Sequence, residues 1–491
     1  MFQSFFHFYE TIYVPDHAAP LNRWVHFVSN LAALACCTTG IFSGFLPLFL
    51  LGIWFQLGPP YLGHIAFEKT HRSIDQNPIF AAMGSWYTTG QILLAKQSVT
   101  HGPVPWVPPE TAAQEGRQPA LRRLLDRYGR NLHGFMALER GLEVWLDPAG
   151  DAGVAYVAVP GHWVAAGAPQ CAEAARAEVA GRFADAARAA GARAVFFGVG
   201  PTWVSAQGCG RFDPFPIGRT PVWHPRRWPE CLATSPKLRN RLRRAQREGV
   251  TVRPAPADAL EVGGPLHDDL VDVVTRWTQQ RGLPPLGFMT QLDLHHDADA
   301  RRTWVAEGPR GVEGFAFCVP VPGRRGWLVE DLLVPRGAAP GTAEALIDHA
   351  MGALAAEGAQ LVTLGMVVCA DVPEDPSHPL LQRVVQRVHR LGGRAYPAEG
   401  LLRFRRKLRP HGWEDVFLAS DGPVRVGTLV AVLRAFTGGL ALFALHTLER
   451  AVARRAAPVA RRLRPCELRR ASHRLWCHVV CPRLPAGWGH T

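Results

Sequence analysis

Lysine is almost missing from this chain of 491 residues, which has lysine only at positions 69, 96, 237 and 407. Charged residues of both signs make up only 19% of the chain, yet basic residues outnumber acidic ones, 54 to 41, and the formal net charge is +13. Nearly all of the positive charge is therefore arginine. A basic surplus favours contact with anionic lipid or nucleic acid. The hydrophobic share of 47% excludes a disordered chain.

Cysteine is also scarce, with ten in the whole chain. Because none are spaced as zinc ligands with partners, the pattern excludes a disulfide scaffold and a zinc module, and predicts thiols in a reducing compartment. The first ten residues lack the basic region and cleavage site of a secretory signal. The mean hydropathy of −0.02 excludes a chain that spans a membrane throughout, so any membrane segment is local.

Charge is completely missing from Trp24 to Phe67, a run of 44 residues. A helix needs about 20 apolar residues to cross a bilayer. Ser43-Gly44 interrupts the run near its middle, and Gly58-Pro59-Pro60 interrupts it again later. The run therefore predicts two membrane-inserted helices or a tight helical hairpin, in preference to a buried helical pair of a soluble core.

A proline-rich segment follows and separates this region from the next. Residues 102–109 contain four prolines, which exclude a regular helix or a central strand. From Arg117 to about Ser420 the pattern is typical of an α/β protein. The order strand–strand–helix–strand occurs twice, about 170 residues apart, and predicts two similar lobes.

The C-terminal part differs again. Val426–Leu445 is apolar except for Arg434, which favours a spanning helix and an interfacial helix equally, because a central charge costs about 2.5–3.5 kcal/mol on insertion. The segment from Arg450 to Arg474 carries nine arginines and one acid. This polybasic run, next to an apolar helix, predicts an anchor on anionic lipid in preference to a solvated tail.

Five polar residues lie within the uncharged run or next to it and could hold a metal: His17, His26, His64, Glu68 and His71. The last three are spaced i, i+4, i+7 and so share one face of a helix. Imidazoles with one carboxylate suit iron or zinc. Interfacial side chains that make local hydrogen bonds would give the same pattern, and spacing alone favours that plainer interpretation.

The motifs around these residues favour the metal site over the plainer interpretation. Tyr13-x3-His17-x4-Asn22-Arg23-x2-His26, followed by Gly63-His64-x2-Phe67-Glu68-Lys69, resembles the small membrane family that includes yeast 2-hydroxy fatty acid dioxygenase. The resemblance covers about residues 8–95. It implies a helical hairpin in the membrane with Fe(II) bound by histidine.

Three further segments carry chemistry-bearing residues. Lys237 to Arg247 has six basic residues in eleven positions, with Leu238, Leu242 and Ala245 at helical spacing, which predicts an amphipathic basic helix that faces phosphates or only solvent. Glu330 and Asp331 lie on a predicted strand that leads to a helix N-terminus. The basic, aromatic segment 400–410 is taken, by itself, as a solvated edge strand.

In this order the segments resemble the C-terminal catalytic domain of the phosphatidylglycerol lysyltransferase family, also called the multiple peptide resistance factor family. The matching motifs are the helix 238–250, the Gly-Phe-Met turn 287–289, the Pro-Gly-Thr-x-Glu helix start 340–344, Val362–Gly365 and the segment that closes at Trp413. The resemblance implies a tandem acetyltransferase-like (GNAT) fold that uses aminoacyl-tRNA, with a lipid hydroxyl at the cytoplasmic leaflet as acceptor. Pro340 removes an N–H that would cradle the pyrophosphate of acetyl-CoA, which disfavours that donor.

The hypothesis for the transferase site follows from these motifs. Glu330 or Asp331 would bind the aminoacyl ammonium or assist proton transfer, although structural ion pairing would explain them equally well. Lys407 and Arg405 would contact phosphate or the oxyanion. The tRNA acceptor end would contact basic residues of the helix, namely Lys237, Arg239, Arg243 and Arg244.

The predicted fold class is α/β with tandem GNAT-like lobes, an all-α membrane hairpin before them, and an apolar helix with a basic tail after them. The expected boundaries are 1–100, a linker at 101–117, lobes at 118–250 and 251–420, and the tail at 421–491. The expected partners are aminoacyl-tRNA, anionic lipid and the membrane, but not DNA.

The predicted function is an aminoacyl-tRNA–lipid transferase at the bacterial inner membrane, with its lobes in the cytoplasm and no cofactor for the transfer itself. Two alternatives stay open. One is an Fe(II)-dependent 2-hydroxy fatty acid dioxygenase that works through the histidines, and the other is a lipid-binding protein without catalysis.

Overall fold

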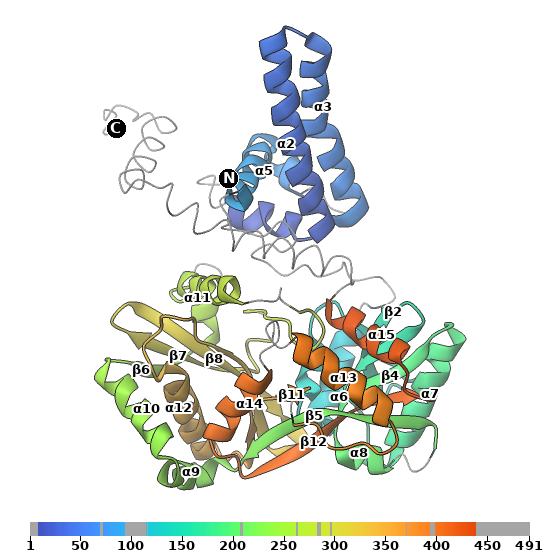
Figure 1. Ribbon diagram of the computed structural model, residues 1–491, viewed down its shortest axis with the longest axis vertical. Helices are drawn as coiled ribbons and strands as arrows, with labels where there is room; N and C mark the ends of the chain where they lie inside the picture. Colours follow the sequence, from blue (N-terminus) through green and yellow to red (C-terminus); the bar gives the residue numbers. More distant parts are fainter. Residues whose placement is uncertain are drawn as a thin grey trace, which may run out of the picture.

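The computed structural model describes residues 8–68, 72–93, 114, 116–206, 210–261, 264–281, 286–294, 297–369, 371–392 and 398–437. The N-terminal region is all helical and is drawn in blue in Figure 1. Its elements are η1 (Tyr9–Tyr13), η2 (Pro15–His17), α2 (Pro20–Ser43), α3 (Leu46–Gly63), η3 (His64–Glu68), α4 (Arg72–Gln76) and α5 (Pro78–Leu93).

Helices α2 and α3 form a tight antiparallel pair. Gly44 ends α2 in the left-handed region at φ 67°, which allows the chain to reverse within two residues. The helices approach closely, since a side-chain carbon at Gly52 would overlap Cys37. Among the described helices, α2 is long and apolar enough to cross a membrane.

The outer surface of this pair is apolar. Large hydrophobic side chains stay exposed along it, including Leu34, Ile41, Phe42, Phe45, Leu46, Leu50, Trp54, Leu57 and Leu62. A contiguous apolar surface of this size is typical of a membrane contact. It supports the predicted insertion of the hairpin, which stays a prediction.

The second region is built on one mixed sheet of 12 strands, in the order β1-β2-β3-β4-β12-β5-β10-β9-β8-β7-β6, with β11 paired to β5. The strands are β1 (Glu143–Leu146), β2 (Gly153–Val159), β3 (His162–Ala166), β4 (Arg193–Val199), β5 (Phe212–Trp223), β6 (Thr251–Ala255), β7 (Arg302–Gly308), β8 (Gly311–Val321), β9 (Gly326–Leu333), β10 (Leu361–Thr363), β11 (Val367–Val368) and β12 (Gly412–Asp421). The helices that accompany them are α6 (Arg117–Tyr128), α7 (Arg176–Ala189), α8 (Pro201–Ala206), α9 (Trp228–Thr234), α10 (Pro236–Arg247), α11 (His267–Gln280), α12 (Thr342–Ala356), α13 (Pro379–Gly392), α14 (Ala398–Lys407) and α15 (Val426–Thr437).

The same local topology occurs in both halves of the sheet. In the first half, β2 and β3 are antiparallel, α7 follows, and β4 returns parallel to β3. In the second half, β8 and β9 are antiparallel, α12 follows, and β10 returns parallel to β9. The order strand–strand–helix–strand that the sequence predicted is therefore present twice.

Helices cover the two faces of the sheet, and alternate residues of β4 show the division. Phe196 of β4 packs on the side of α7, in the core cluster that includes Phe183. Phe197 packs on the opposite side, in the cluster that also receives residues of α6, α13 and α15. This alternation is the period of two that a strand buried on both faces requires.

One local prediction was wrong. The segment 400–410 is the helix α14 and not an edge strand, because Ala398 and Leu402 lie one helical turn apart and are both buried. The strand β10 ends at Thr363, and Gly365 then turns the chain at φ 74°.

The apolar segment that begins at Val426 lies on the sheet. Its described part is α15, only 12 residues long, and Thr428, Ala431 and Ala435 of this helix are buried. Phe436 of α15 contacts the ring of Phe197. The rest of that segment and the Arg-rich run 450–474 lie outside the described residues.

Candidate functional site

Three histidines of the N-terminal region come together at the base of the helical pair. His17 ends η2, His26 lies in the second turn of α2, and His64 begins η3 directly after α3. One ring nitrogen from each lies within 4.8 Å of the others. The start of α2 and the end of α3 are thus both needed to assemble the cluster.

Hydrogen bonds orient these rings. His17 Nδ1 donates to the Tyr13 carbonyl oxygen at 2.7 Å, so its Nε2 is the acceptor nitrogen and lies 3.0 Å from His64 Nε2. His26 Nδ1 lies 3.1 Å from the Ser85 hydroxyl, and its buried Nε2 has no hydrogen-bond partner among the described residues. Burial and the two neighbouring imidazoles hold the pKa of His17 well below its usual range. A neutral, oriented imidazole is the form that binds a metal.

The two carboxylates nearby, Glu68 and Asp16, accept hydrogen bonds from neighbouring segments of the chain. Glu68 Oε1 accepts a hydrogen bond from the backbone N–H of Ala19 at 2.7 Å, next to the start of α2, and burial raises the pKa of Glu68 to about 7. Asp16 Oδ2 accepts from the Ser73 hydroxyl at 2.6 Å and lies 4.0 Å from His64 Nδ1. The structure therefore brings together three of the five predicted ligands. Glu68 lies outside the group of three, and His71 lies outside the described residues.

The donor set of this cluster fits a divalent transition metal. Three imidazoles with an orphaned buried nitrogen suit iron or zinc, and the shell of carboxylate and hydroxyl partners resembles that of known metal sites.

The second group of candidate residues lies on β9 of the α/β region. Glu330 Oε2 accepts a hydrogen bond from Arg301 Nη2 at 3.1 Å, and both side chains are more than nine-tenths buried. Asp331, the next residue, has a buried Oδ2 with no hydrogen-bond partner among the described residues. The two neighbours thus differ, because only Glu330 has this buried arginine as a hydrogen-bond partner.

Sequence reasoning missed a third carboxylate at this place. Glu139, which follows η4 (Gly134–Leu138), is buried and accepts a hydrogen bond from the Gln291 backbone N–H at 3.3 Å. Burial, and then the charge of Glu330, hold its pKa well above the usual range. Burial and Glu330 also raise the pKa of Asp331. A buried cluster with more carboxylates than arginines favours an added cation.

Basic residues of α14 are engaged with neighbouring segments. Lys407 donates to Glu344 in the first turn of α12, and Arg406 Nη2 donates to Asp371 at 2.9 Å. Arg405 donates to the carbonyl oxygens of Leu364 and Met366 in the turn after β10. These bonds brace α14 against the loops around it, and they occupy groups that were predicted to face phosphate or an oxyanion.

Two carboxylates of the protein, those of Glu313 and Glu344, already lie at the N-terminus of α12. Glu313 accepts a hydrogen bond from the Ala339 backbone N–H, and Glu344 lies in the first helical turn. A helix N-terminus binds a phosphate through free N–H groups. Carboxylates in that place, together with Pro340, disfavour the pyrophosphate of an acyl-CoA donor.

The predicted basic helix is α10, and its burial pattern agrees with the sequence. Leu238 and Ala245 are buried, while Lys237, Arg243 and Arg244 are exposed. Arg239 differs from the others, because it donates to the carbonyl oxygens of Leu232 and Ala233 at the end of α9. α10 thus presents a cationic face with Arg239 turned back onto its neighbour.

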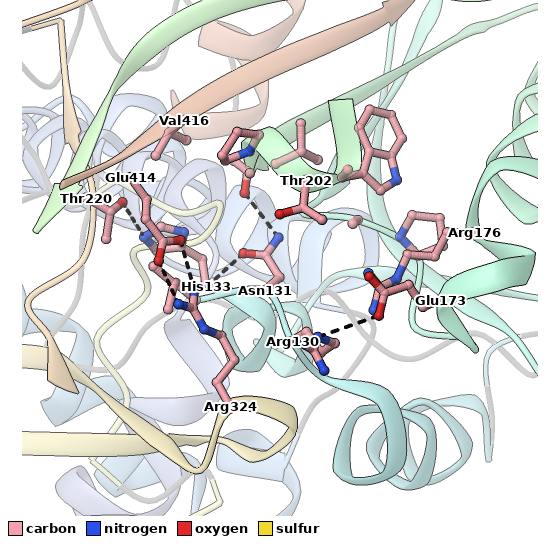
Figure 2. Close-up of a pocket in the computed structure, with 18 of the residues that line it drawn as sticks. Arg130, Asn131, His133, Glu173, Arg176, Thr202, Thr220, Arg324, Glu414 and Val416 are labelled. Atoms are coloured by element: carbon pink, nitrogen blue, oxygen red, sulfur yellow. Dashed lines mark hydrogen bonds and ion pairs between the residues drawn. The ribbon is translucent and has the colours of Figure 1, made fainter. Parts of the chain in front are cut away.

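A cleft of about 260 Å³ borders β4, β5 and β12, and Figure 2 shows part of its lining. Arg324 binds Glu414 there through two hydrogen bonds of 2.8 and 2.6 Å, which balances the charge. Burial, with Arg405 as a second cause, lowers the pKa of His133 to about 3, so this ring is neutral. None of the sequence-predicted site residues lines the cleft.

Two family models match this chain. The model for the C-terminal domain of phosphatidylglycerol lysyltransferase matches residues 122–420. The model for Mpo1-like 2-hydroxy-palmitic acid dioxygenase matches residues 2–97. Both resemblances drawn from the motifs are thereby confirmed. Comparison with curated protein sequences finds no match.

Solved structures agree with the first of these models. The C-terminal domain of a protein assigned as a lysylphosphatidylglycerol synthetase from Agrobacterium fabrum is 21% identical with a TM-score of 0.55, and the match covers 66% of this chain and 98% of that one. The structure of L-PGS from Bacillus licheniformis is 18% identical with a TM-score of 0.56, and the match covers 69% of this chain and 100% of that one. At these identities the likeness shows the fold alone.

Proposed function

The chain belongs to the phosphatidylglycerol lysyltransferase C-terminal family, and from this membership we propose that it is a membrane-associated transferase that moves an aminoacyl group from aminoacyl-tRNA onto a lipid such as phosphatidylglycerol. The helical hairpin within residues 1–100 anchors it. The segment 101–117 links the anchor to tandem GNAT-like lobes at 118–250 and 251–420, and residues 421–491 add further basic charge. The proposed location is the bacterial inner membrane, with the lobes in the cytoplasm.

The observation that carries this proposal is the carboxylate cluster on β9. Asp331 has a buried oxygen without a hydrogen-bond partner among the described residues, and the charges of Glu330 and Glu139 are close to it. The ammonium group of an aminoacyl ester supplies the missing cation and the missing donors. Bound there, the ester carbonyl is held in a fixed place, and positioning is the main requirement of a reaction whose donor is already activated.

The transfer is a transesterification in which atoms balance without a cofactor. The lipid hydroxyl oxygen attacks the ester carbonyl carbon, and the bond from that carbon to the ribose oxygen of tRNA breaks. The proton of the attacking hydroxyl ends on the leaving ribose oxygen. In this proposal, Asp331 carries this proton or holds the ammonium. Because its raised pKa lies nearer neutrality than that of an ordinary carboxyl, either role is open to it.

The basic face of α10 supplies the contact for tRNA. Lys237, Arg243 and Arg244 are exposed and reach solvent, where phosphates of an acceptor stem can approach. Arg239 positions this helix against α9 instead. Lys407 and Arg405 hold the loops that border the site through the bonds they make to α12 and to the turn after β10.

Lipid analysis of a host that expresses the full chain tests the proposal. Mass spectrometry should find a lipid heavier by one aminoacyl residue than in a host with empty vector. Asp331→Asn should reduce its amount about 100-fold, the size of a lost electrostatic contact in a transition state. Asp268→Asn, at a side chain that is 98% exposed, is the matched control and should leave the lipid unchanged. A full yield with Asp331→Asn would remove this residue from the mechanism.

The histidine cluster favours a second activity in the same chain. The N-terminal domain is Mpo1-like, and His17, His26 and His64 are placed to hold a metal. Fe(II) bound there would supply the oxygen chemistry that shortens a 2-hydroxy fatty acid. The residues of this chain would orient the ligands, through Tyr13 and Ser85, and would keep the site beside the apolar surface from which an acyl chain enters.

Depletion of 2-hydroxy acyl chains in the same lipid extracts tests this second activity. His64→Ala should restore them to the level of the empty-vector host, and His267→Ala, at a histidine of α11, serves as the control. Unchanged 2-hydroxy acyl chains in the presence of bound iron would count against it.

A further inference from the structure

The carboxylate of Asp213 contacts the segments that precede both α13 and α15. Asp213, near the start of β5, lies 2.9 Å from His378 Nε2, and the same Oδ2 accepts a hydrogen bond from the Val424 backbone N–H at 2.7 Å. His378 also lies 2.8 Å from Asp375 through its Nδ1. One carboxylate oxygen therefore fixes the residues that precede both helices.

Both helices then pack on the same core. Leu381 and Val385 of α13 and Leu429 and Val432 of α15 lie against one hydrophobic cluster, which also contains Phe197. Each helix thus has an inner side held by the sheet. Figure 1 shows both helices at the surface of the α/β region. Their outer sides determine what this surface contacts.

The outer sides carry apolar side chains that nothing in the described chain covers. Leu380 on α13 is 72% exposed, and Val426 and Leu433 on α15 are 59% and 49% exposed. Val426 and Leu433 are seven positions apart, so they lie on one stripe of the helix. Exposed leucines and valines on two neighbouring helices are unusual for a surface that only contacts water.

Positive charge surrounds these apolar side chains. Arg383 and Arg387 are exposed and lie three and seven positions after Leu380, on the same side of α13. Arg425 is exposed at the start of α15, and Arg434 is half-buried beside Leu433. Neither helix contains an acidic residue. Apolar residues flanked by arginines are typical of a helix that lies in the interface of an anionic bilayer.

We propose that Leu380, Arg383, Arg387, Arg425, Val426 and Leu433, the α13–α15 face, dock the α/β region onto an anionic lipid surface. Charge complementarity favours a bilayer over a second copy of this chain, because two copies of a face without acids would repel. The N-terminal hairpin already exposes a contiguous apolar surface. Docking by the α13–α15 face adds a second contact, which would hold the α/β region against the headgroups. The inference does not depend on the chemistry of the transfer.

Photocrosslinking of the full chain in phosphatidylglycerol vesicles tests this docking. We would introduce p-benzoylphenylalanine in place of Leu380 or Leu433, and in place of Ala177 as the control. Ala177 is an exposed residue of α7, which packs on the opposite face of the sheet. Lipid adducts should be about ten-fold more abundant at positions 380 and 433 than at 177, and should fall several-fold when phosphatidylcholine replaces phosphatidylglycerol. Arg383→Glu with Arg387→Glu should cause a similar fall.

Each other outcome overturns the proposal. Adducts at positions 380 and 433 no more abundant than at 177 would show that the face does not meet lipid. Adducts to protein would assign it to another chain or a second copy. All three positions are exposed, so the probe does not require a change in the core, and circular dichroism checks the fold. Aminoacyl lipid measured in the same preparation separates a failure of docking from a failure of transfer.

Discussion

The Nε2 atoms of His17 and His64 lie 3.0 Å apart, although the residues are 47 positions apart in the chain. His17 donates its Nδ1 proton to the Tyr13 carbonyl, so its Nε2 presents a lone pair toward His64. Without a metal, His64 Nε2–H donates to this lone pair. A metal ion that replaced this proton would bind both atoms and would also give the buried His26 Nε2 a partner.

We expect metal binding to depend on these imidazoles. After anaerobic purification, the full chain should carry close to one metal ion per chain, and His17→Ala or His64→Ala should lose it, because two remaining ligands bind a divalent ion weakly. Inductively coupled plasma mass spectrometry gives the metal content. His267→Ala should keep the metal. Equal metal in all four proteins would contradict the assignment.

A smaller loss is expected for the residue that orients His26. Ser85→Ala removes the hydroxyl that lies 3.1 Å from His26 Nδ1 and should weaken metal affinity about 10- to 100-fold, as changes around metal ligands usually do. Competition with a chelator measures this change. Thr38→Ala, at an exposed hydroxyl that bonds only within α2, is the matched control.

The buried carboxyl of Asp331 should make the protein less stable as pH rises. Its folded-state pKa is raised, so the folded chain keeps a proton that the unfolded chain releases above about pH 4. The free energy of unfolding should therefore fall from that pH upward. Asp331→Asn should reduce this pH dependence and should raise the unfolding temperature at neutral pH, even as it reduces transfer.

Thermal unfolding at acidic and neutral pH checks that expectation. Glu139, whose pKa is also raised, remains in the variant, so the slope should become smaller without disappearing. Asp268→Asn should leave the slope as it is. A variant less stable than the parent at neutral pH would show that Asp331 is held by a cation in the protein as isolated.

Lys407 and Glu344 form a pair whose loss should be costly. Their side chains are 24% and 8% exposed, so Lys407→Ala leaves a buried carboxylate without its cation and should destabilise the fold by about 3 kcal/mol. Adding Glu344→Gln should recover part of this loss. Arg227→Ala breaks a pair in which both side chains are more than half exposed and should cost less than about 1 kcal/mol. Thermal unfolding in detergent compares the variants.

Gly341 permits the close approach of α10 to α12. Its φ is 102°, and a side-chain carbon there would overlap the Arg241 carbonyl oxygen. Gly341→Ala should therefore shift α10, lower the unfolding temperature and weaken tRNA binding. Gly352 lies within α12 and has open space around it. Gly352→Ala should therefore stabilise the protein by up to about 1 kcal/mol. Comparable effects of the two variants would show that the contact with Arg241 is unimportant.

Some elements follow from the sequence because they depend on neighbours along the chain. The uncharged run predicted the α2–α3 pair, since helices need only local apolar residues and a turn at Ser43-Gly44. The spacing of Leu238, Leu242 and Ala245 predicted α10 correctly for the same reason. The segment 400–410 was mistaken for a strand, because its basic residues conceal the buried Ala398 and Leu402.

Two of the central strands, β5 and β12, could not be predicted in this way. β12 lies between β4 and β5, although the whole second half of the sheet separates it from them in sequence. β5 carries Pro214, Pro216 and Pro221, which argue against a central strand. It tolerates them partly because its ladder with β12 is irregular between Val416 and Phe417.

The sequence by itself determined which two families this chain resembles, its basic charge, and the histidines and acids that could carry chemistry. Only the tertiary structure decided which of these groups meet. It joined His17, His26 and His64, left Glu68 outside that group, placed Glu139 with Asp331, and engaged Lys407 with Glu344. The reason is physical: local conformation depends on neighbours in sequence, while the pairing and burial of charges depend on residues that only the folded chain brings together.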